Sequence, residues 1–477
     1  MKLQELVHKK DSIPIPSTAA GKIVSIFLLL VFFLLPFQPK ILRHLFKQFS
    51  VASIPDHLLL PQFFSKTIAF FPTDLVLLTL TGTILVIYRK KWKEVLWAGP
   101  SKFLTLLALI MLLSIGCSIS SHYPLQYLQW FQFAMMAMFF HGLRISLSRE
   151  HCTSFIRAVA WLMCVLGLVE CLIGCSQFFL QHEVGLKWLG EKSMKYCTFP
   201  LPSGERWIFD RLFHVKTEMT HIKRICGTVA NPNVLGGFLF CSLLSSTYLF
   251  FTSGNKRCRW FLGGSIVFQI MTLLLSFSRA ALLATLLSMT IWFYLQWRAK
   301  VRVKKTLILF LASIMVCGAV FYPSLASRGG IFNYNSQTEE ADTERMIYHR
   351  IAWKMLKENP VLGVGYNNFQ LHTSRFAPSD WPLLHSKVHN IYLLIAAETG
   401  ILGITCFLLF LLAILREAVK NLYSSETMFL FSVVCGLLVI GCCDFYLVQS
   451  AFGQGLFLGM TALLYSSRRP VDHCHHS

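Results

Sequence analysis

Long apolar runs recur along the whole of this sequence, and they restrict it to one broad class of fold. A helix needs about 20 apolar residues to cross the hydrocarbon core of a bilayer. Only 14% of the 477 residues are charged, whereas a soluble domain has about 25%. We therefore expect an all-α polytopic membrane protein with about twelve transmembrane helices. The twelve candidate runs are 23–38, 68–88, 103–119, 125–143, 155–180, 233–252, 260–277, 280–297, 306–322, 390–415, 428–447 and 450–466.

The connections between these runs carry very unequal charge. Connections 89–102, 253–259 and 298–305 hold five, three and five Lys and Arg residues, whereas 120–124 and 445–449 hold none. An excess of Lys and Arg in short loops marks the cytoplasmic side of a membrane. The net charge of +21 therefore follows membrane topology, and we expect no nucleic-acid partner.

Two long connections interrupt the single membrane domain that we expect over residues 1–477. The same alternation places 181–231 and 323–388 on the exterior side, the second of them between spans 9 and 10. Segment 39–67 would also lie there, although its four cations fit that side less well. Long ordered loops on a rigid scaffold often carry function, so the exterior connections are the first places to search for a site.

The connection 323–388 contains a pattern typical of an amphipathic helix over residues 342–358. Asp342 or Thr343 can cap its start, and Pro360 follows its end. The two glycines of VLGVG at 361–365 predict a tight turn after the helix. We expect this helix to lie flat against the outer membrane surface. The apolar positions that recur at four-residue spacing are Ile347, Ile351 and Met355.

Basic residues decorate this helix in two registers. Arg350 and Lys354 share one face, whereas Arg345 lies about 140° away from Arg350 at 100° per residue. The register of the helix therefore decides which arginine faces the rest of the protein.

Three exterior positions are candidates for chemistry. Arg279 lies 20 residues after Arg259 and 19 before Arg298, so it occupies a tight turn between two spans. Arg350 lies on the amphipathic helix, and His389 opens the apolar run that follows. Each has an ordinary structural alternative: a snorkelling or capping arginine, a solvated charge and a capping histidine. Together, two guanidiniums can bind a diphosphate, and a neutral histidine can accept a proton from a hydroxyl.

Other polar residues near the runs leave alternatives open. Asn231 can cap a helix that begins with Pro232, and Arg224 before it can help to hold an anion. Gly236 and Gly237 permit close packing of that helix against its neighbours. No metal-ligand cluster or nucleotide-binding loop occurs in the sequence, so we expect neither a metal nor a cofactor. Glu170 and Asp444, within or beside spans, are either relay groups or buried partners of arginines or hydroxyls. Glu398 can pair with a cation on a neighbouring helix.

The order of these motifs resembles the O-antigen ligase family, which also includes O-antigen polymerases and some protein O-oligosaccharyltransferases. One match is SRAALL at 278–283, and another is RIAWKMLKENPVLGVGYNNF at 350–369. The third is VHNIYLLIAAETGILG at 388–403, close to the family's His-Asn-x-x-Leu and Glu-Thr-Gly pattern. A weaker fourth is ANPN at 230–233. The resemblance covers roughly residues 220 to 415 in detail, and the first 200 residues match only in hydropathy.

The resemblance implies a glycosyltransferase of the cell inner membrane whose active site faces the periplasm. The donor would be a glycan on undecaprenyl diphosphate, and the acceptor a lipid A-core sugar or another glycan. By resemblance, Arg279 and Arg350 hold the diphosphate and stabilise the leaving group, while His389 activates or orients the acceptor hydroxyl. The reaction would invert the anomeric carbon without a metal ion. Further candidates for binding the diphosphate or the acceptor are Arg224, Arg345, Asn390 and Lys354.

Several alternatives stay open at this point. A polymerase or a protein glycosyltransferase of the same family would have the same donor site. A polysaccharide or lipid-carrier transporter would instead have charged residues near mid-bilayer and paired broken helices. The sequence also leaves open whether Cys197 and Cys226, in one exterior connection, form a disulfide.

Overall fold

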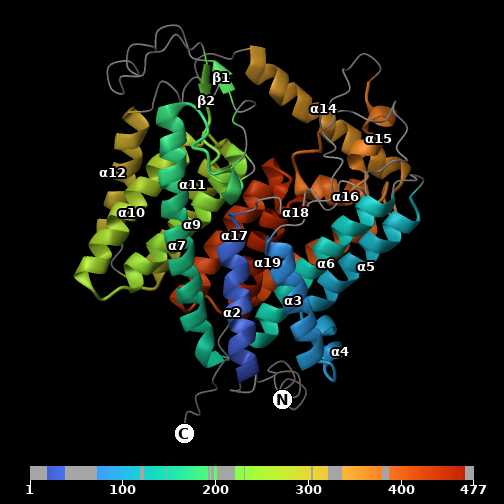
Figure 1. Ribbon diagram of the computed structural model, residues 1–477, viewed down its shortest axis with the longest axis horizontal. Coiled ribbons are helices and arrows are strands. Elements are labelled where there is room, and N and C mark those ends of the chain that lie inside the picture. Colours follow the sequence, from blue (N-terminus) through green and yellow to red (C-terminus); the bar gives the residue numbers. More distant parts are fainter. Residues whose placement is uncertain are drawn as a thin grey trace.

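The computed structural model describes residues 19–37, 72–118, 123–147, 149–191, 194, 198–200, 221–229, 231–301, 304–320, 336–378 and 386–467. These segments form a helical bundle with one short antiparallel ribbon, in which Thr198 pairs with Lys223 (Figure 1). The sequence did not predict the ribbon, which lies inside connection 181–231. The elements are α2 Ala19–Leu34, α3 Pro72–Ile87, α4 Trp92–Trp97, α5 Ser101–Gly116, α6 Tyr123–Ser146, α7 Arg149–Leu180, η2 Lys187–Leu189, β1 Thr198–Pro200, β2 His221–Lys223, α9 Pro232–Thr252, α10 Lys256–Leu275, α11 Arg279–Arg298, α12 Lys304–Val320, α14 Ser336–Glu358, α15 Phe369–Phe376, α16 Ile391–Lys420, α17 Ser425–Cys443, α18 Tyr446–Gln449 and α19 Ala451–Ser466.

Each of the twelve predicted apolar runs overlaps a helix, which confirms a helical polytopic architecture. By length and composition, six helices are long and apolar enough to cross a membrane. They are His151–Leu180, Pro232–Thr252, Lys256–Leu275, Arg279–Arg298, Ile391–Lys420 and Ser425–Cys443. Ile23–Leu34, Pro72–Ile87 and Ser101–Gly116 are apolar but shorter. The number twelve therefore stays a prediction.

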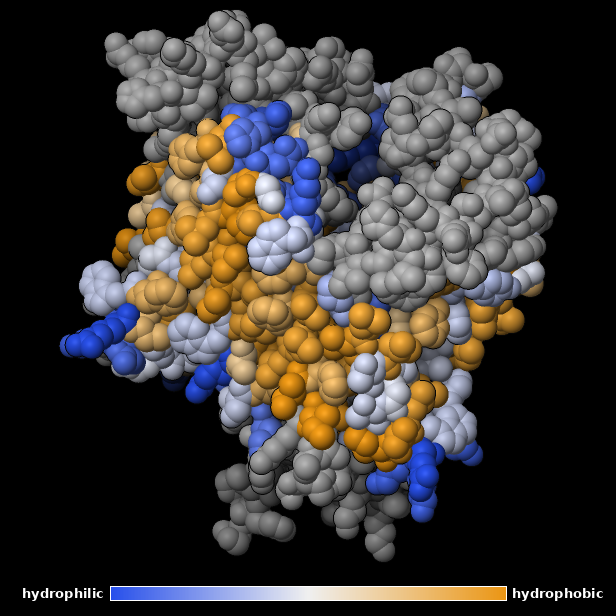
Figure 2. Space-filling model, viewed as in Figure 1, coloured by the Kyte–Doolittle hydropathy of each residue, from blue (hydrophilic) through white to orange (hydrophobic). Residues whose placement is uncertain are grey.

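The outside of the bundle is apolar, as a lipid-facing surface must be. Hydrophobic side chains cover the middle of the face in Figure 2, and hydrophilic ones gather toward its ends. Trp260 and Trp297 are 84% and 67% exposed beside Arg259 and Arg298. Exposed tryptophan next to cations is typical of a membrane–water interface.

Helix α9 forms the centre of the bundle. In its apolar window 89% of the residues are buried, and it packs against α7, α10, α11 and α17. Asn231 caps it by accepting hydrogen bonds from the N–H groups of Asn233 and Val234, and Pro232 is its first residue. A Cβ at Gly237 would lie 1.8 Å from the hydroxyl of Tyr446. The predicted cap and the predicted close packing of the glycine pair are both confirmed.

The two ends of the bundle differ. In Figure 1, the β1–β2 ribbon, α14 and α15 lie at the upper end, and α4 and the α9–α10 connection lie at the lower end. The arrangement separates the long connections from the basic connections 89–102 and 253–259, as the charge pattern predicts. Which end faces the periplasm stays a prediction.

Helix α14 differs from its prediction in two respects. It begins at Ser336 rather than at 342, so Asp342 and Thr343 lie inside it and do not cap it. Its apolar face is buried and α14 packs against α16, so the expectation that this face rests on the membrane surface is wrong. The helix ends at Glu358 and Pro360 follows, as predicted. The buried positions are Ile347, Tyr348, Ile351, Ala352 and Met355.

Helix α16 is interrupted at Gly400, whose φ of 65° and ψ of −167° lie in a region that only glycine adopts readily. The turn after α14 fills the break. The N–H groups of Val364 and Gly365 donate to the carbonyls of Ala397 and Glu398 at 2.9 and 3.0 Å, and Ile401 N–H donates to the Pro360 carbonyl at 2.8 Å. The backbone groups that α16 cannot pair internally are therefore paired by the turn.

Glycine is required on both sides of this joint. A Cβ at Gly363 would lie 2.4 Å from the Ala397 carbonyl oxygen, and one at Gly400 would lie 2.2 Å from the Val361 carbonyl oxygen. The predicted tight turn of VLGVG is confirmed, and its glycines interlock with the Glu-Thr-Gly sequence of α16.

Several predictions lie partly or wholly outside the described residues, among them the exterior placement of segment 39–67. Cys197 is not described, so its pairing with Cys226 is not tested. Of connection 323–388, residues 336–378 and 386–388 are described.

Substituting Gly400 by Ala should destabilise the fold. The substitution combines a backbone conformation that costs about 1–3 kcal/mol with a steric clash, so the midpoint of thermal unfolding in detergent should fall by several degrees. Gly264→Ala is the matched control, since that glycine is exposed on α10 and a Cβ there meets nothing within 4 Å. Equal midpoints for the two variants would show that the break does not need glycine.

Candidate functional site

His389 lies just before α16, at the upper end of the bundle. Asn390 caps this helix by accepting hydrogen bonds from the N–H groups of Tyr392 and Leu393 at 2.9 and 3.0 Å, and its amide nitrogen donates to the Cys442 carbonyl at 3.3 Å. Asn390 was predicted to contact the substrate. In the structure, its amide oxygen and its amide nitrogen both form hydrogen bonds with backbone groups. The cap fixes where His389 leaves the helix.

The His389 ring is held in a defined environment. It packs edge-to-face on Phe445 with ring centroids 5.2 Å apart. Its Nδ1 atom is buried and has no hydrogen-bond partner among the described residues. Burial lowers the pKa of His389, the positive charges of Arg345 and His349 lower it further, and the Asp444 carboxylate opposes them. His389 is therefore kept neutral, as a proton acceptor must be.

Helix α14 brings Arg345, and not Arg350, to this histidine. Arg345 is partly buried and close enough to His389 to act on its charge, and the Nδ1 atom of His349 hydrogen-bonds the Arg345 carbonyl at 2.8 Å. Arg350 lies on the exposed side of α14. Lys354 is also exposed, and its ammonium group reaches the Phe376 carbonyl at 3.4 Å. The register of α14 thus favours Arg345 over Arg350, although the sequence analysis gave Arg350 the main role.

Arg279 approaches the same place from another helix. It is the first residue of α11 and is exposed. Arg279 and Arg345 both lie within electrostatic reach of Cys443, the last residue of α17. The starts of α11 and α16 and one face of α14 therefore meet at the end of α17.

Asp444 is a site residue that the sequence did not single out, beyond its alternatives as a relay group or a buried partner. It is 5% exposed. One carboxylate oxygen accepts a hydrogen bond from the Asn233 amide at 2.8 Å, and the other accepts one from the Phe445 N–H at 2.8 Å. Its position near the end of the apolar run 428–447 was the one available signal.

Arg224 has a structural role in this arrangement. Its Nε and Nη2 atoms donate to the Ser276 carbonyl at 3.0 and 2.9 Å, and Nη2 also donates to Phe277 O at 3.3 Å and to Asn233 Oδ1 at 3.0 Å. Arg224 thus caps the carboxyl end of α10, just before Arg279, and orients the amide that holds Asp444. The Arg224 guanidinium is engaged in these hydrogen bonds, and the predicted role of Arg224 in binding an anion is not tested.

The segment that carries Arg224 is itself fixed from α7. The Gln177 amide oxygen accepts hydrogen bonds from the N–H groups of Cys226 and Gly227 at 3.0 and 2.8 Å. Glu170, buried in the bundle, accepts hydrogen bonds from the N–H and hydroxyl of Thr228. Of its two predicted alternatives, the structure shows Glu170 as the partner of a hydroxyl.

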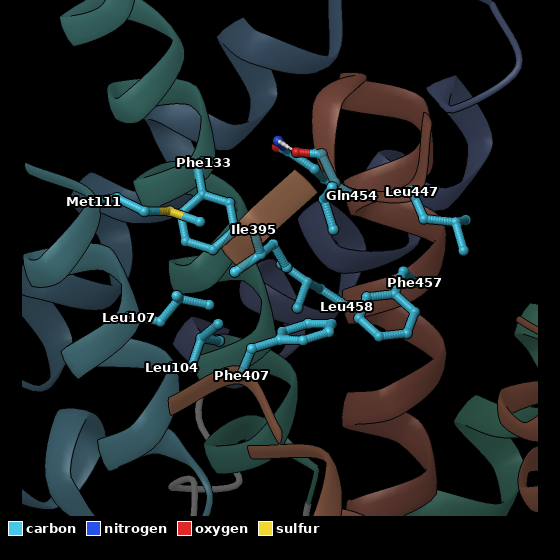
Figure 3. A pocket seen from close by; sticks show the side chains of 11 residues that line it. Leu104, Leu107, Met111, Phe133, Ile395, Phe407, Leu447, Gln454, Phe457 and Leu458 are labelled. Carbon is cyan, nitrogen blue, oxygen red and sulfur yellow. Dashed lines mark hydrogen bonds between the residues drawn. The ribbon is translucent and has the colours of Figure 1, made fainter. Parts of the chain in front are cut away.

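A cavity elsewhere in the bundle does not resemble a site for a charged substrate. It lies between α5, α6, α16, α18 and α19, and its lining is apolar except for Gln454, whose amide nitrogen donates to the Val448 carbonyl at 2.8 Å (Figure 3). None of the predicted site residues lines it. Helix α16 contributes Ile395 and Phe407 to its lining, one from each side of the break at Gly400.

Replacing Asp444 by Asn should lower the pKa of His389, since the carboxylate is the neighbour that raises it. The pH dependence of His389 modification by diethyl pyrocarbonate, followed by peptide mass spectrometry, measures this pKa without any assay of activity. Glu417→Gln, at an exposed ion pair with Lys420, is the control and should leave the pKa unchanged. An unchanged or raised pKa in Asp444→Asn would mean that Asp444 does not act on the imidazole.

Comparison with known proteins agrees with the motifs. Residues 264–408 match the model of a family described as O-antigen ligase. The matched segment includes three of the four motifs named above and, with them, Arg279, Arg345, Arg350 and His389. No curated protein matches the chain. The match over residues 264–408 confirms the O-antigen ligase family resemblance, and with the apolar helices it supports a multi-pass membrane enzyme that acts on glycans.

Proposed function

We propose that this protein transfers a glycan from undecaprenyl diphosphate to an acceptor hydroxyl at the periplasmic face of the inner membrane. The acceptor that we favour is a sugar of the lipid A-core. The observation that supports the proposal most is the electrostatic proximity of two guanidiniums and one imidazole. Arg345 acts on the charge of His389, and both Arg279 and Arg345 act on that of Cys443. The helices concerned are neighbours, since α11 and α16 pack against α17 and α14 packs against α16.

The two arginines suit a diphosphate leaving group. Each guanidinium is permanently charged and offers several N–H donors in a fork that matches phosphate oxygens. As the bond between the anomeric carbon and the diphosphate breaks, the electron pair stays with the diphosphate, and donors already in place stabilise the charge that develops. We assign this role to Arg279 and Arg345.

His389 suits the acceptor. As the acceptor oxygen attacks the anomeric carbon, its proton passes to the neutral imidazole, which contributes about 10²–10⁴-fold to the rate. Asp444 stabilises the imidazolium that forms. Attack opposite the leaving group inverts the anomeric carbon, and no step requires a metal ion.

The acceptor separates the members of the family. A second lipid-linked glycan would make the protein a polymerase, and a Ser or Thr hydroxyl would make it a protein O-oligosaccharyltransferase. A purified preparation given one labelled undecaprenyl diphosphate donor and all three acceptors in competition assigns the activity by the product formed.

The transporter alternative predicts broken helices in pairs. Helix α16 is broken at Gly400, and it is the one helix in the described ranges with such an interruption. The backbone at the break is paired by the turn after α14. Movement of the lipid carrier across the membrane without glycan transfer, by protein in vesicles, would favour the transporter.

Single substitutions should separate the two arginines of α14. Arg279→Ala and Arg345→Ala should each lower transfer by about 10–150-fold, the equivalent of about 1.5–3 kcal/mol for a hydrogen bond to a charged group. His389→Ala should lower transfer by about 10²–10⁴-fold, the contribution of a general base. Arg350→Ala should stay within a few-fold of the unmodified protein. The assay is initial-rate transfer to lipid A-core, with folding checked by thermal unfolding.

Arg375→Ala is the control for loss of a periplasmic-end cation, because Arg375 is exposed and pairs with Glu358 at 3.2 Å. Loss of transfer in Arg350→Ala with normal rates in Arg345→Ala would restore the assignment made from the sequence. Normal rates in Arg279→Ala, Arg345→Ala and His389→Ala would reject the site.

A further inference from the structure

A buried lysine lies two residues before His389 and takes no part in the reaction described above. Lys387 is 7% exposed. Its ammonium group donates hydrogen bonds to the side-chain oxygens of Asn367 and Gln449. A buried ammonium is costly unless it is hydrogen-bonded and balanced by an opposite charge, so its place in the fold needs an explanation.

The balancing charge is Glu398, which is 1% exposed inside α16. Gln449 links the two groups, because its oxygen accepts from Lys387 while its nitrogen donates to Glu398 at 3.2 Å. The N–H of Phe369 donates to the other oxygen of Glu398 at 3.3 Å. The network joins residue 387, the start of α15, the broken part of α16 and the end of α18.

Gln449 is the last residue of the short segment 444–449, and the first two residues of this segment interact with His389. Asp444 acts on the charge of the imidazole, and Phe445 packs against its ring. At the other end of this segment, Gln449 binds Lys387. Residues 387 and 389 are therefore both docked on one segment, with Val388 fully buried between them.

We propose that Lys387 is a positioning residue that holds His389 against Asp444. It ties the segment before α16 to α18 through Gln449 and to the turn in the α16 break through Asn367, with Glu398 as its counter-charge. The inference rests on the proposed function only for the consequence in catalysis. The position of the imidazole itself can be measured without transfer.

The test removes both charges together. Lys387→Met alone would leave Glu398 buried without its counter-charge, whereas Lys387→Met with Glu398→Gln leaves no unbalanced charge. Gln449, released from the lysine, can turn its oxygen toward the new amide. The matched control is Lys420→Met with Glu417→Gln, which removes an exposed lysine–glutamate pair at 2.9 Å.

Two readouts distinguish positioning from a merely structural role. The first is the pKa of His389 from its modification by diethyl pyrocarbonate. The groups that face His389 are Asp444 after α17 and Arg345 and His349 on α14, and only Asp444 raises this pKa. The paired variant should therefore lower the pKa, because the imidazole moves away from Asp444. Adding Asp444→Asn to the paired variant should lower it no further.

The second readout is steady-state transfer to lipid A-core. The paired variant should lose about 10–100-fold in kcat, with KM for the donor within about two-fold, because a small misplacement of a reacting group has effects of this size. The acid limb of its pH–rate profile should move to lower pH, in the direction of the lowered pKa. Asn367→Ala, which keeps the other three groups, should give a smaller change of the same sign, and this variant decides the question should the paired variant not fold.

An unchanged His389 pKa in a folded paired variant would overturn the proposal, as would additive effects of the paired variant and Asp444→Asn. The proposed function can fail independently of the positioning role of Lys387. Absence of transfer by the unmodified protein, with the expected shift in the His389 pKa, would reject glycan transfer and leave the positioning role intact. Normal transfer by the unmodified protein, with no shift of the His389 pKa in the paired variant, would reject the positioning role and leave glycan transfer intact.

Discussion

The backbone joint between the turn after α14 and the break in α16 is the constraint on which the site depends. In an apolar environment, unpaired N–H and C=O groups cost several kcal/mol each, so a helix can be interrupted there only if another segment supplies partners. Residues 360–365 supply them through Val364, Gly365 and the Pro360 carbonyl. The joint fixes α14 relative to α16, and Arg345 relative to His389.

The sequence predicted the parts of this arrangement that follow from local chemistry. Apolar length located the helices, and the Asn-Pro pair at 231–232 located the start of α9. The glycines of VLGVG indicated a turn. The break at Gly400 was not predicted, because a single glycine in an apolar run is compatible with an unbroken helix. Only the approach of Val361, from a distant part of the chain, makes glycine necessary there.

The register of α14 could not be obtained from the sequence for a similar reason. Arg345 and Arg350 lie on different faces of the helix. Apolar residues occur on more than one side of it, with Ile347 and Ile351 in one direction and Met346 and Trp353 in another. Packing against α16 buries the first pair and leaves the second 58% and 52% exposed. Asp444 was missed as a site residue because its connection to Arg224 runs through Asn233, more than 200 residues away in sequence.

If the proposed function holds, the charges around His389 would give the donor a role in preparing the base. In the protein alone, burial and the charges of Arg345 and His349 lower the pKa of His389, which keeps it neutral but also makes it a weaker base. A diphosphate bound by Arg279 and Arg345 would bring negative charge to the same place and offset the effect of the arginine on the imidazole. The basicity of His389 would then rise when the leaving group is in position. Such coupling would favour proton removal from the acceptor in the presence of the donor over proton removal in its absence.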